Sequence, residues 1–231
     1  MTLFYINELS EQQIILTPEE SKHLLKVLRA RKGDTVLFTD GKGHLANTIL
    51  DQENIKGCIC RINDISFVPP DPRKMHLAVS TLKNNNRFEW LIEKAVELGV
   101  HKITPLLCER TEKPFVRRER LEKIMVSAMK QSERLYLPVL APPEHYNNVV
   151  TKCKEQLRLI PHCASGEKET VAALQTPPTS IVILIGPEGD FTAKEIDLAL
   201  QHRFTPVTLG KARLRTETAA IALLSYFAVN G

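Results

Sequence analysis

Two glycine-containing turns in the last quarter of the chain carry the residues most able to do chemistry. The first is LIGPEGDF at 184–191, and the second is LGKARLRTET at 209–218. Each puts glycine where an apolar strand is expected to end, and one amphipathic segment separates the two turns. Open α/β sheets usually hold ligands at the carboxyl ends of their strands. The two turns therefore predict a cleft of backbone amides and carbonyls at one sheet edge.

The first turn does not belong to a common nucleotide-binding motif. Its GPEG core lacks the Lys-Ser or Lys-Thr of a P-loop and the three-glycine spacing of a dinucleotide fold. Alone, it is most simply an ordinary strand exit. The second turn strengthens the ligand-site interpretation because arginine, threonine and glutamate gather within 213–218. The structural alternative is that Thr216 caps a helix and Glu217 favours its dipole, with solvated arginines beside them.

Length and composition indicate one large domain or two smaller ones. The chain has 231 residues, 43% of them hydrophobic, and no apolar run approaches the roughly 18 residues of a membrane span. The first residues lack the basic and apolar regions of a signal peptide. Five scattered cysteines without a CxxC pair predict free thiols rather than a zinc site or a disulfide framework. We therefore expect a cytoplasmic protein without a metal, and scattered histidines make a metal hydrolase a weak alternative.

Positive charge concentrates in one stretch of the chain. Residues 73–134 hold fourteen Lys/Arg against eight Asp/Glu, whereas the segments on either side are nearly balanced. A local positive field suits a phosphate-rich partner, because neutralising phosphates releases counterions. A solvated helix face with interspersed salt bridges is the alternative. Charge is compatible with nucleic acid but does not establish it.

Three prolines at 69, 70 and 72 predict a domain boundary, with domains at 1–70 and 73–231. The first domain reads as a small barrel or curled sheet, with a capping box from Thr17 and a hairpin turn at Asp40-Gly41. Its expected elements are a helix through 23–30 and strands at 36–40, 44–50 and 57–67.

The second domain alternates strands with helices, which predicts a parallel sheet covered on both faces. A helix after the first strand should end at Gly99, and Trp90 on it is most simply a core residue. Thr192 and Glu195 form a capping box that opens a later helix. The other expected elements are strands at 75–82, 102–107, 158–163, 180–186 and 207–210, and helices at 117–134 and 216–229.

These motifs together resemble the bacterial 16S ribosomal RNA (uracil-N3) methyltransferase family, of the knotted SPOUT class of S-adenosylmethionine (SAM) methyltransferases. GPEGDF and LG-x-x-x-LRTETA carry the resemblance. It extends in order through HLLKVLR, FEW, EKAVELGV, CERT and QSER at 23–29, 88–90, 93–100, 108–111 and 131–134.

The resemblance implies an N-terminal PUA-like RNA-binding β-barrel domain and a C-terminal knotted parallel α/β methyltransferase domain, in a homodimer. Knots are rare, so the sequence pattern alone would argue against one. The implied reaction is SAM-dependent methylation of N3 of a decoding-region uridine in 16S rRNA of the small ribosomal subunit. A SPOUT ribose 2′-O methyltransferase of rRNA or tRNA is the first alternative. A non-catalytic RNA-binding module is the second, which the intact GPEG and LRTET pair disfavours.

Site residues follow from matching positions. Arg215 is the expected cationic partner of the uracil ring, and Glu217 is the nearest carboxylate that could take its proton, although a helix-dipole role remains the simpler one for Glu217. The resemblance implies cofactor contacts from Leu184, Ile185, Gly186, Glu188, Gly189, Leu209, Gly210, Leu214, Thr216 and Thr218, with His162 and Ala164 at the exit of the preceding strand.

The expected RNA contacts are His23, Arg29, Arg87, Arg110, Arg134 and Arg213. The chain departs from the family pattern at 211–213, where Lys, Ala and Arg replace Pro, Arg and Ile. The usual arginine position is therefore Ala212, and we expect Arg213 to substitute from a shifted angle. Asp190 stands where the family has a third glycine.

Overall fold

The computed structural model describes residues 3–9, 12–174 and 179–229, which divide into two compact units. Unit 1 comprises Met1–Pro70 and Met129–Leu137, and unit 2 comprises Asp71–Ala128 and Pro138–Gly231. The division after Pro70 lies in the proline-rich stretch. The sequence boundary placed 129–137 in the second domain, but two backbone hydrogen bonds, from Gly43 N–H to Leu135 and from Leu137 N–H to Gly41, tie it to unit 1.

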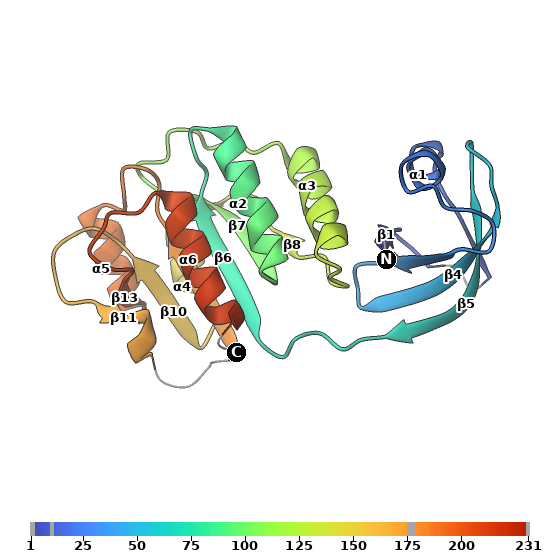
Figure 1. The fold of residues 1–231 in the computed structure, drawn as a ribbon. Coiled ribbons are helices and arrows are strands. Elements are labelled where there is room, and N and C mark those ends of the chain that lie inside the picture. Colours follow the sequence, from blue (N-terminus) through green and yellow to red (C-terminus); the bar gives the residue numbers. More distant parts are fainter. Residues whose placement is uncertain (1–2, 10–11, 175–178, 230–231) are drawn as a thin grey trace. The chain divides into compact units, whose positions relative to one another are not determined.

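Unit 1 is built on a five-stranded sheet of order β1-β3-β4-β5-β2 (Figure 1). β1 runs parallel to β3 and the other pairings are antiparallel. The edge strands β1 and β2 do not pair with each other among the described residues, so the sheet is an open half-barrel. The bounds are β1 Leu3–Tyr5, β2 Gln13–Ile15, β3 Thr35–Thr39, β4 His44–Gln52 and β5 Ile59–Phe67.

The core of unit 1 forms from alternating strand positions. Phe4 and Phe38 are fully buried against each other, with ring centroids 5.6 Å apart. Cys58 and Cys60 are also fully buried, and both are free thiols, as are the other three cysteines. Their spacing reflects packing on one face of a strand.

The helix predicted at 23–30 is only partly correct. Thr17 Oγ1 accepts from Glu20 N–H and caps a short helix α1, Pro18–Lys22. The next turn, His23–Val27, is π-helical, and the Leu28 N–H bonds to the His23 carbonyl. Arg29 then takes φ +58°, which ends the helix before residue 30.

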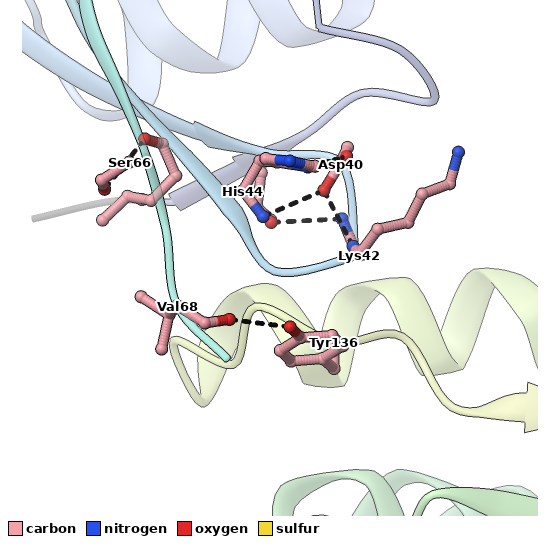
Figure 2. A network of polar contacts seen from close by, with 9 residues as sticks. Asp40, Lys42, His44, Ser66, Val68 and Tyr136 are labelled. Atoms are coloured by element: carbon pink, nitrogen blue, oxygen red, sulfur yellow. Dashed lines mark hydrogen bonds and ion pairs between the residues drawn. The ribbon is translucent and has the colours of Figure 1, made fainter. Parts of the chain in front are cut away.

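Figure 2 shows how the β3–β4 hairpin is held. Asp40 Oδ1 accepts from the backbone N–H groups of Lys42 and His44, at 2.8 and 3.3 Å, and Asp40 Oδ2 lies 2.7 Å from His44 Nδ1. Burial acts to raise the pKa of Asp40, but these donors outweigh it and hold the pKa below its ordinary value. The Asp40 carboxylate therefore accepts the hydrogen bonds that the backbone N–H groups of this turn would otherwise make to water.

Tyr136 packs beside the turn of this hairpin, and its hydroxyl donates to the carbonyl of Val68, directly after β5, at 2.7 Å (Figure 2). Gly43 has φ +100°, and a Cβ there would collide with the Tyr136 hydroxyl. Only glycine fits this close approach.

Unit 2 is an eight-stranded parallel sheet of order β11-β13-β10-β12-β6-β7-β8, with β9 also paired to β7. The predicted α/β class is confirmed. The strands are β6 Lys74–Ser80, β7 Lys102–Leu107, β8 Val139–Leu140, β9 Glu144–His145, β10 Leu157–Pro161, β11 Glu169–Thr170, β12 Ser180–Ile185 and β13 Thr205–Thr208. The helices are α2 Asn85–Glu97, α3 Arg118–Gln131, α4 Tyr146–Lys152, α5 Ala193–Gln201 and α6 Thr216–Val229, with a 3₁₀ turn at Val171–Ala173.

The two faces of this sheet carry different helices. α4 and α5 pack together over one face, where Ala78, Leu106 and Leu184 join their apolar residues in one cluster. α2 and α6 lie side by side on the other face, and α6 contacts β12 and β6 (Figure 1). Because α6 returns from the outer strand β13 to the middle of the sheet, the 209–215 segment crosses the carboxyl ends of β10 and β12. The trefoil knot implied by the resemblance stays a prediction.

Trp90 is not a core residue, since 45% of it is exposed. The buried face of α2 is a 3.6-residue stripe that includes Phe88, Leu91 and Ile92, and position 90 falls beside it. No helix in the described part of the chain is long and apolar enough to cross a membrane.

Candidate functional site

A pocket of about 840 Å³ lies where the carboxyl ends of β10, β12 and β13 meet in unit 2. Both glycine-containing turns line it, as their spacing predicted. Of the predicted residues, it brings together Arg87, His162, Ile185, Gly186, Glu188, Leu209, Gly210, Arg213, Leu214, Arg215 and Thr216. Sequence reasoning missed Pro161, Lys168, Val207, Thr208 and Ala219 as lining residues. Cys163 and Pro187 stand between predicted residues, and Asp190, Lys211 and Ala212 were noted only as departures from the family pattern.

The other predicted residues lie elsewhere. Leu184 is fully buried in the sheet core. Arg110 is occupied by the first turn, because its guanidinium donates to the Gly189 carbonyl at 2.7 Å. Ala164, Gly189, Thr218 and Glu217 stand close in sequence to lining residues but do not line the pocket. The proposed RNA contacts His23, Arg29 and Arg134 belong to unit 1.

The first turn is shaped by a carboxylate in the place of a glycine. Asp190 adopts φ +63°, which asparagine and aspartate tolerate better than other side chains. Its Oδ2 accepts from the Cys163 N–H at 2.7 Å and so ties the exit of β10 to the exit of β12. The Asp190 position was visible in the sequence as a departure, and the positive φ explains why glycine is usual there.

The second turn depends on Gly210. It has φ +112°, and a Cβ at this position would meet no atom within 4 Å. The glycine is therefore required by backbone conformation and leaves open space at the pocket wall. Lys211, Ala212 and Arg213 all line the pocket directly after it.

A bidentate ion pair stands at the pocket rim. Arg87 Nε and Nη2 donate to the two carboxylate oxygens of Glu217 at 2.8 and 2.6 Å. The Glu217 side chain is only 10% exposed. The pair joins α2 to the first turn of α6, and both carboxylate oxygens are engaged. This engagement favours a structural role for Glu217 over that of a proton acceptor.

His162 contributes a buried imidazole nitrogen to the pocket wall. Its Nδ1 is buried and has no hydrogen-bond partner among the described residues. Burial, assisted by the charge of Lys168, lowers the pKa of His162 below its ordinary value. The imidazole is therefore neutral at pH 7 and offers one acceptor and one donor nitrogen.

The arrangement fits a flat, partly apolar ligand with a charged end. Ile185, Leu209 and Leu214 supply apolar surface, while the carboxylates of Glu188 and Asp190 lie on the same lining. The described residues contain no group of three or more His, Cys, Asp or Glu able to hold a metal ion.

Comparison with known proteins identifies the family. The RNA methyltransferase domain family matches residues 69–228, and the RNA methyltransferase PUA domain family matches 16–63. The ribosomal RNA small subunit methyltransferase E of Synechocystis is 34% identical over 94% of this chain and 73% of its own length. This chain belongs to the ribosomal RNA small subunit methyltransferase E family.

Solved structures agree with this assignment. A methyltransferase from Legionella pneumophila, in complex with SAM, has a TM-score of 0.88 and 32% identity, covering 100% of this chain and 98% of the other. The ribosomal RNA small subunit methyltransferase E of Neisseria gonorrhoeae, bound to SAM, has a TM-score of 0.88 and 30% identity, covering 100% of this chain and 98% of the other. As a family member, the chain is an RNA methyltransferase with an N-terminal PUA-like domain.

Proposed function

We propose that this chain transfers a methyl group from SAM to N3 of one uridine in the 16S rRNA of the small ribosomal subunit. The resemblance of the sequence motifs implies a decoding-region uridine, 1498 in conventional rRNA numbering, as the target. We further propose that the enzyme acts as a cytoplasmic homodimer, which rests on the sequence resemblance. The observation that carries the reaction is the two-turn pocket with Arg215 on its lining.

The residues of this pocket fit SAM. Its apolar residues suit an adenine ring, and Gly210 leaves open space at the wall where a side chain would stand. The unpartnered Nδ1 of His162 and the carboxylates of Glu188 and Asp190 match polar and cationic groups of the cofactor. Bound there, SAM supplies an electrophilic methyl group on a sulfonium.

The chain's own residues must handle the uracil. N3–H is a weak acid, so its proton has to leave before or during methyl transfer. Arg215 is placed to stabilise the negative charge that then develops on the ring oxygens, and its planar guanidinium suits a carbonyl edge. Positioning and electrostatics can supply most of the rate in such an in-line displacement.

Glu217 has a better-supported role than proton acceptor. Its two contacts with Arg87 hold the start of α6, and therefore Arg215 just before it, against α2. We propose Glu217 as a positioning residue, with the proton leaving to solvent or to another group.

Cofactor binding can be tested with two matched glycines. Gly210 and Gly33 both have positive φ and open space around a would-be Cβ, but only Gly210 lies in the pocket. Alanine costs about 1–3 kcal/mol of strain at either position. Calorimetric titration should show that Gly210→Ala weakens SAM binding at least about fivefold, whereas Gly33→Ala leaves it unchanged. Equal SAM affinities of the two variants would contradict the proposal that SAM binds in this pocket.

The acceptor is tested separately with labelled SAM. Unmethylated small subunits, naked 16S rRNA and transfer RNA are each incubated with the enzyme, and label is counted in each RNA. We expect label in 16S rRNA, with subunits preferred. Label chiefly in transfer RNA would contradict the proposed substrate.

A further inference from the structure

A second, smaller pocket lies between the first turns of α2 and the segment that precedes α3. Its volume is about 130 Å³. α2 supplies Asn85 and Phe88 to this pocket, whereas Arg87 of the same turn lines the larger pocket. One helical turn of α2 therefore borders both pockets.

The small pocket has both apolar and polar lining residues, and one of the apolar ones is an exposed aromatic ring. Phe88 and Leu121 are buried, and Phe115 lines the pocket with 69% of its surface exposed. A phenylalanine at the mouth of a pocket offers a π-face to an incoming planar group. The volume of the small pocket is about one sixth of that of the larger pocket.

The rim of this pocket is cationic. Lys113 Nζ donates to Asn85 Oδ1 at 2.9 Å, and Arg117 stands at the entrance to α3. The charge of Glu89 is neutralised by Arg120, which donates to both of its oxygens. The Arg117 guanidinium makes no hydrogen bond or ion pair with another described residue, and its charge acts on Glu89, whose pKa it helps to lower.

The wall that carries Phe115 is fixed in place. Thr81 is 3% exposed, and its hydroxyl donates to the Lys113 carbonyl at 2.5 Å. Together with the Lys113–Asn85 bond, this contact fastens the segment before α3 to both ends of the β6–α2 loop. A preformed wall reduces the entropy lost on binding.

We propose that this pocket receives the base of an unpaired nucleotide that flanks the methylated uridine. The base stacks on Phe115, and Arg117 contacts the phosphate. A small pocket with an exposed aromatic side chain and a guanidinium at its edge is a combination by which proteins hold single-stranded bases. The inference rests on the proposed function, and it names the residues that bind the nucleotide next to the methylated uridine.

The test is a comparison of Phe115→Ala with Phe115→Tyr, on unmethylated small subunits. Loss of one base–aromatic stack corresponds to roughly a fivefold to 150-fold loss of affinity. Phe115→Ala should raise the KM for subunits by an amount in this range, with kcat and SAM affinity unchanged. Phe115→Tyr should restore the KM because its ring still stacks. Leu200→Ala, an apolar truncation on α5 with 45% exposure, is the matched control and should have no effect.

Chemical probing of the 16S rRNA bases identifies the occupant. In the wild-type complex, one unpaired base near the target uridine should be protected, and Phe115→Ala should lose that protection while the target stays protected. An unchanged KM with Phe115→Ala would overturn the proposal while leaving the methyltransferase function intact. A raised KM without any change in base protection would also overturn it, because Phe115 would then contact a ribosomal protein. Absence of methylation by the wild type would instead contradict the proposed function itself.

Discussion

Two arginines enter the cofactor pocket within three positions of each other, and they differ in what they can do. Arg215 directly precedes α6, whose start is held by the Glu217–Arg87 pair, whereas Arg213 follows the glycine turn without such support. A catalytic cation must be held in position before the reaction. We therefore propose the charge-stabilising role for Arg215 and an RNA contact for Arg213.

Arg215→Ala should lower the single-turnover methylation rate about 10²-fold, the effect typical of removing one preorganised donor. SAM affinity, measured by calorimetry, should stay within about twofold of wild type. Arg213→Ala serves as the control with the same charge change and should act mainly on the KM for subunits. A near-wild-type rate for Arg215→Ala would remove this residue from the chemistry.

The ion pair of Glu217 gives a prediction about stability. Glu217→Gln removes the charge that Arg87 binds, and hydrogen bonds to charged groups are worth about 1–3 kcal/mol. Urea unfolding should show a loss in this range, with a rate reduced less than for Arg215→Ala. A large loss of rate at unchanged stability would instead make Glu217 the proton acceptor.

The elements that the sequence predicted correctly are those with a strong hydrophobic periodicity or an unambiguous N-cap. The buried stripe of α2 and the Thr192–Glu195 capping box of α5 were both confirmed, since both N-cap contacts are present. Short elements such as α4, β8 and β9 were not predicted, because two to seven residues carry too little periodicity. The π-helical turn after α1 was missed because its residue types are those of an α-helix.

The candidate site was predictable only as far as its two turns. Asp190 and the Arg87–Glu217 pair depend on strand order and on the return of α6, which bring together residues up to 130 positions apart. Spacing along one chain does not encode such pairs. Lys211 and Ala212 were visible as departures, and their place on the pocket wall became clear only from the structure.

A buried histidine links three elements of unit 2 and predicts a pH dependence. His76 Nδ1 lies 2.7 Å from Glu155 Oε1, and His76 Nε2 lies 2.8 Å from Thr104 Oγ1. The hydrogen bond from His76 outweighs burial and holds the pKa of Glu155 well below its ordinary value of 4.5. A depressed carboxyl pKa stabilises the folded state above the unfolded pKa, and this contribution is lost as the pH falls.

The free energy of unfolding should therefore decrease as the pH is lowered below about 4.5. Glu155→Gln should be less stable than wild type at pH 7, and the difference should shrink toward pH 3. Urea titrations at several pH values measure this. A stability difference independent of pH would show that the Glu155 charge contributes nothing.

The whole molecule combines a PUA-like unit with a methyltransferase unit, and both carry proposed RNA contacts. In unit 1, the exposed Arg29 follows a π-helical turn and takes a positive φ. Such local strain persists where surrounding structure enforces it and is common at functional sites. An RNA substrate that engages both units should depend on basic residues in each.

Arg29→Gln should weaken binding to small subunits and reduce the salt dependence of the binding constant. The slope of log K against log salt should become shallower by about 0.7–0.9 for each phosphate that the protein no longer neutralises. SAM affinity should not change. Lys152→Gln on α4 makes the same change in net charge and is the control. If both variants had the same effect, Arg29 would contribute only its charge and would not contact the RNA.

The proposed reaction is tested most directly by the identity of its product. Unmethylated small subunits are incubated with the enzyme and SAM, and the 16S rRNA is digested for nucleoside mass spectrometry with positional mapping. We predict 3-methyluridine at a single decoding-region position. A 2′-O-methyl nucleoside, or methylation of a base other than uracil, would contradict the assignment of N3 as the acceptor.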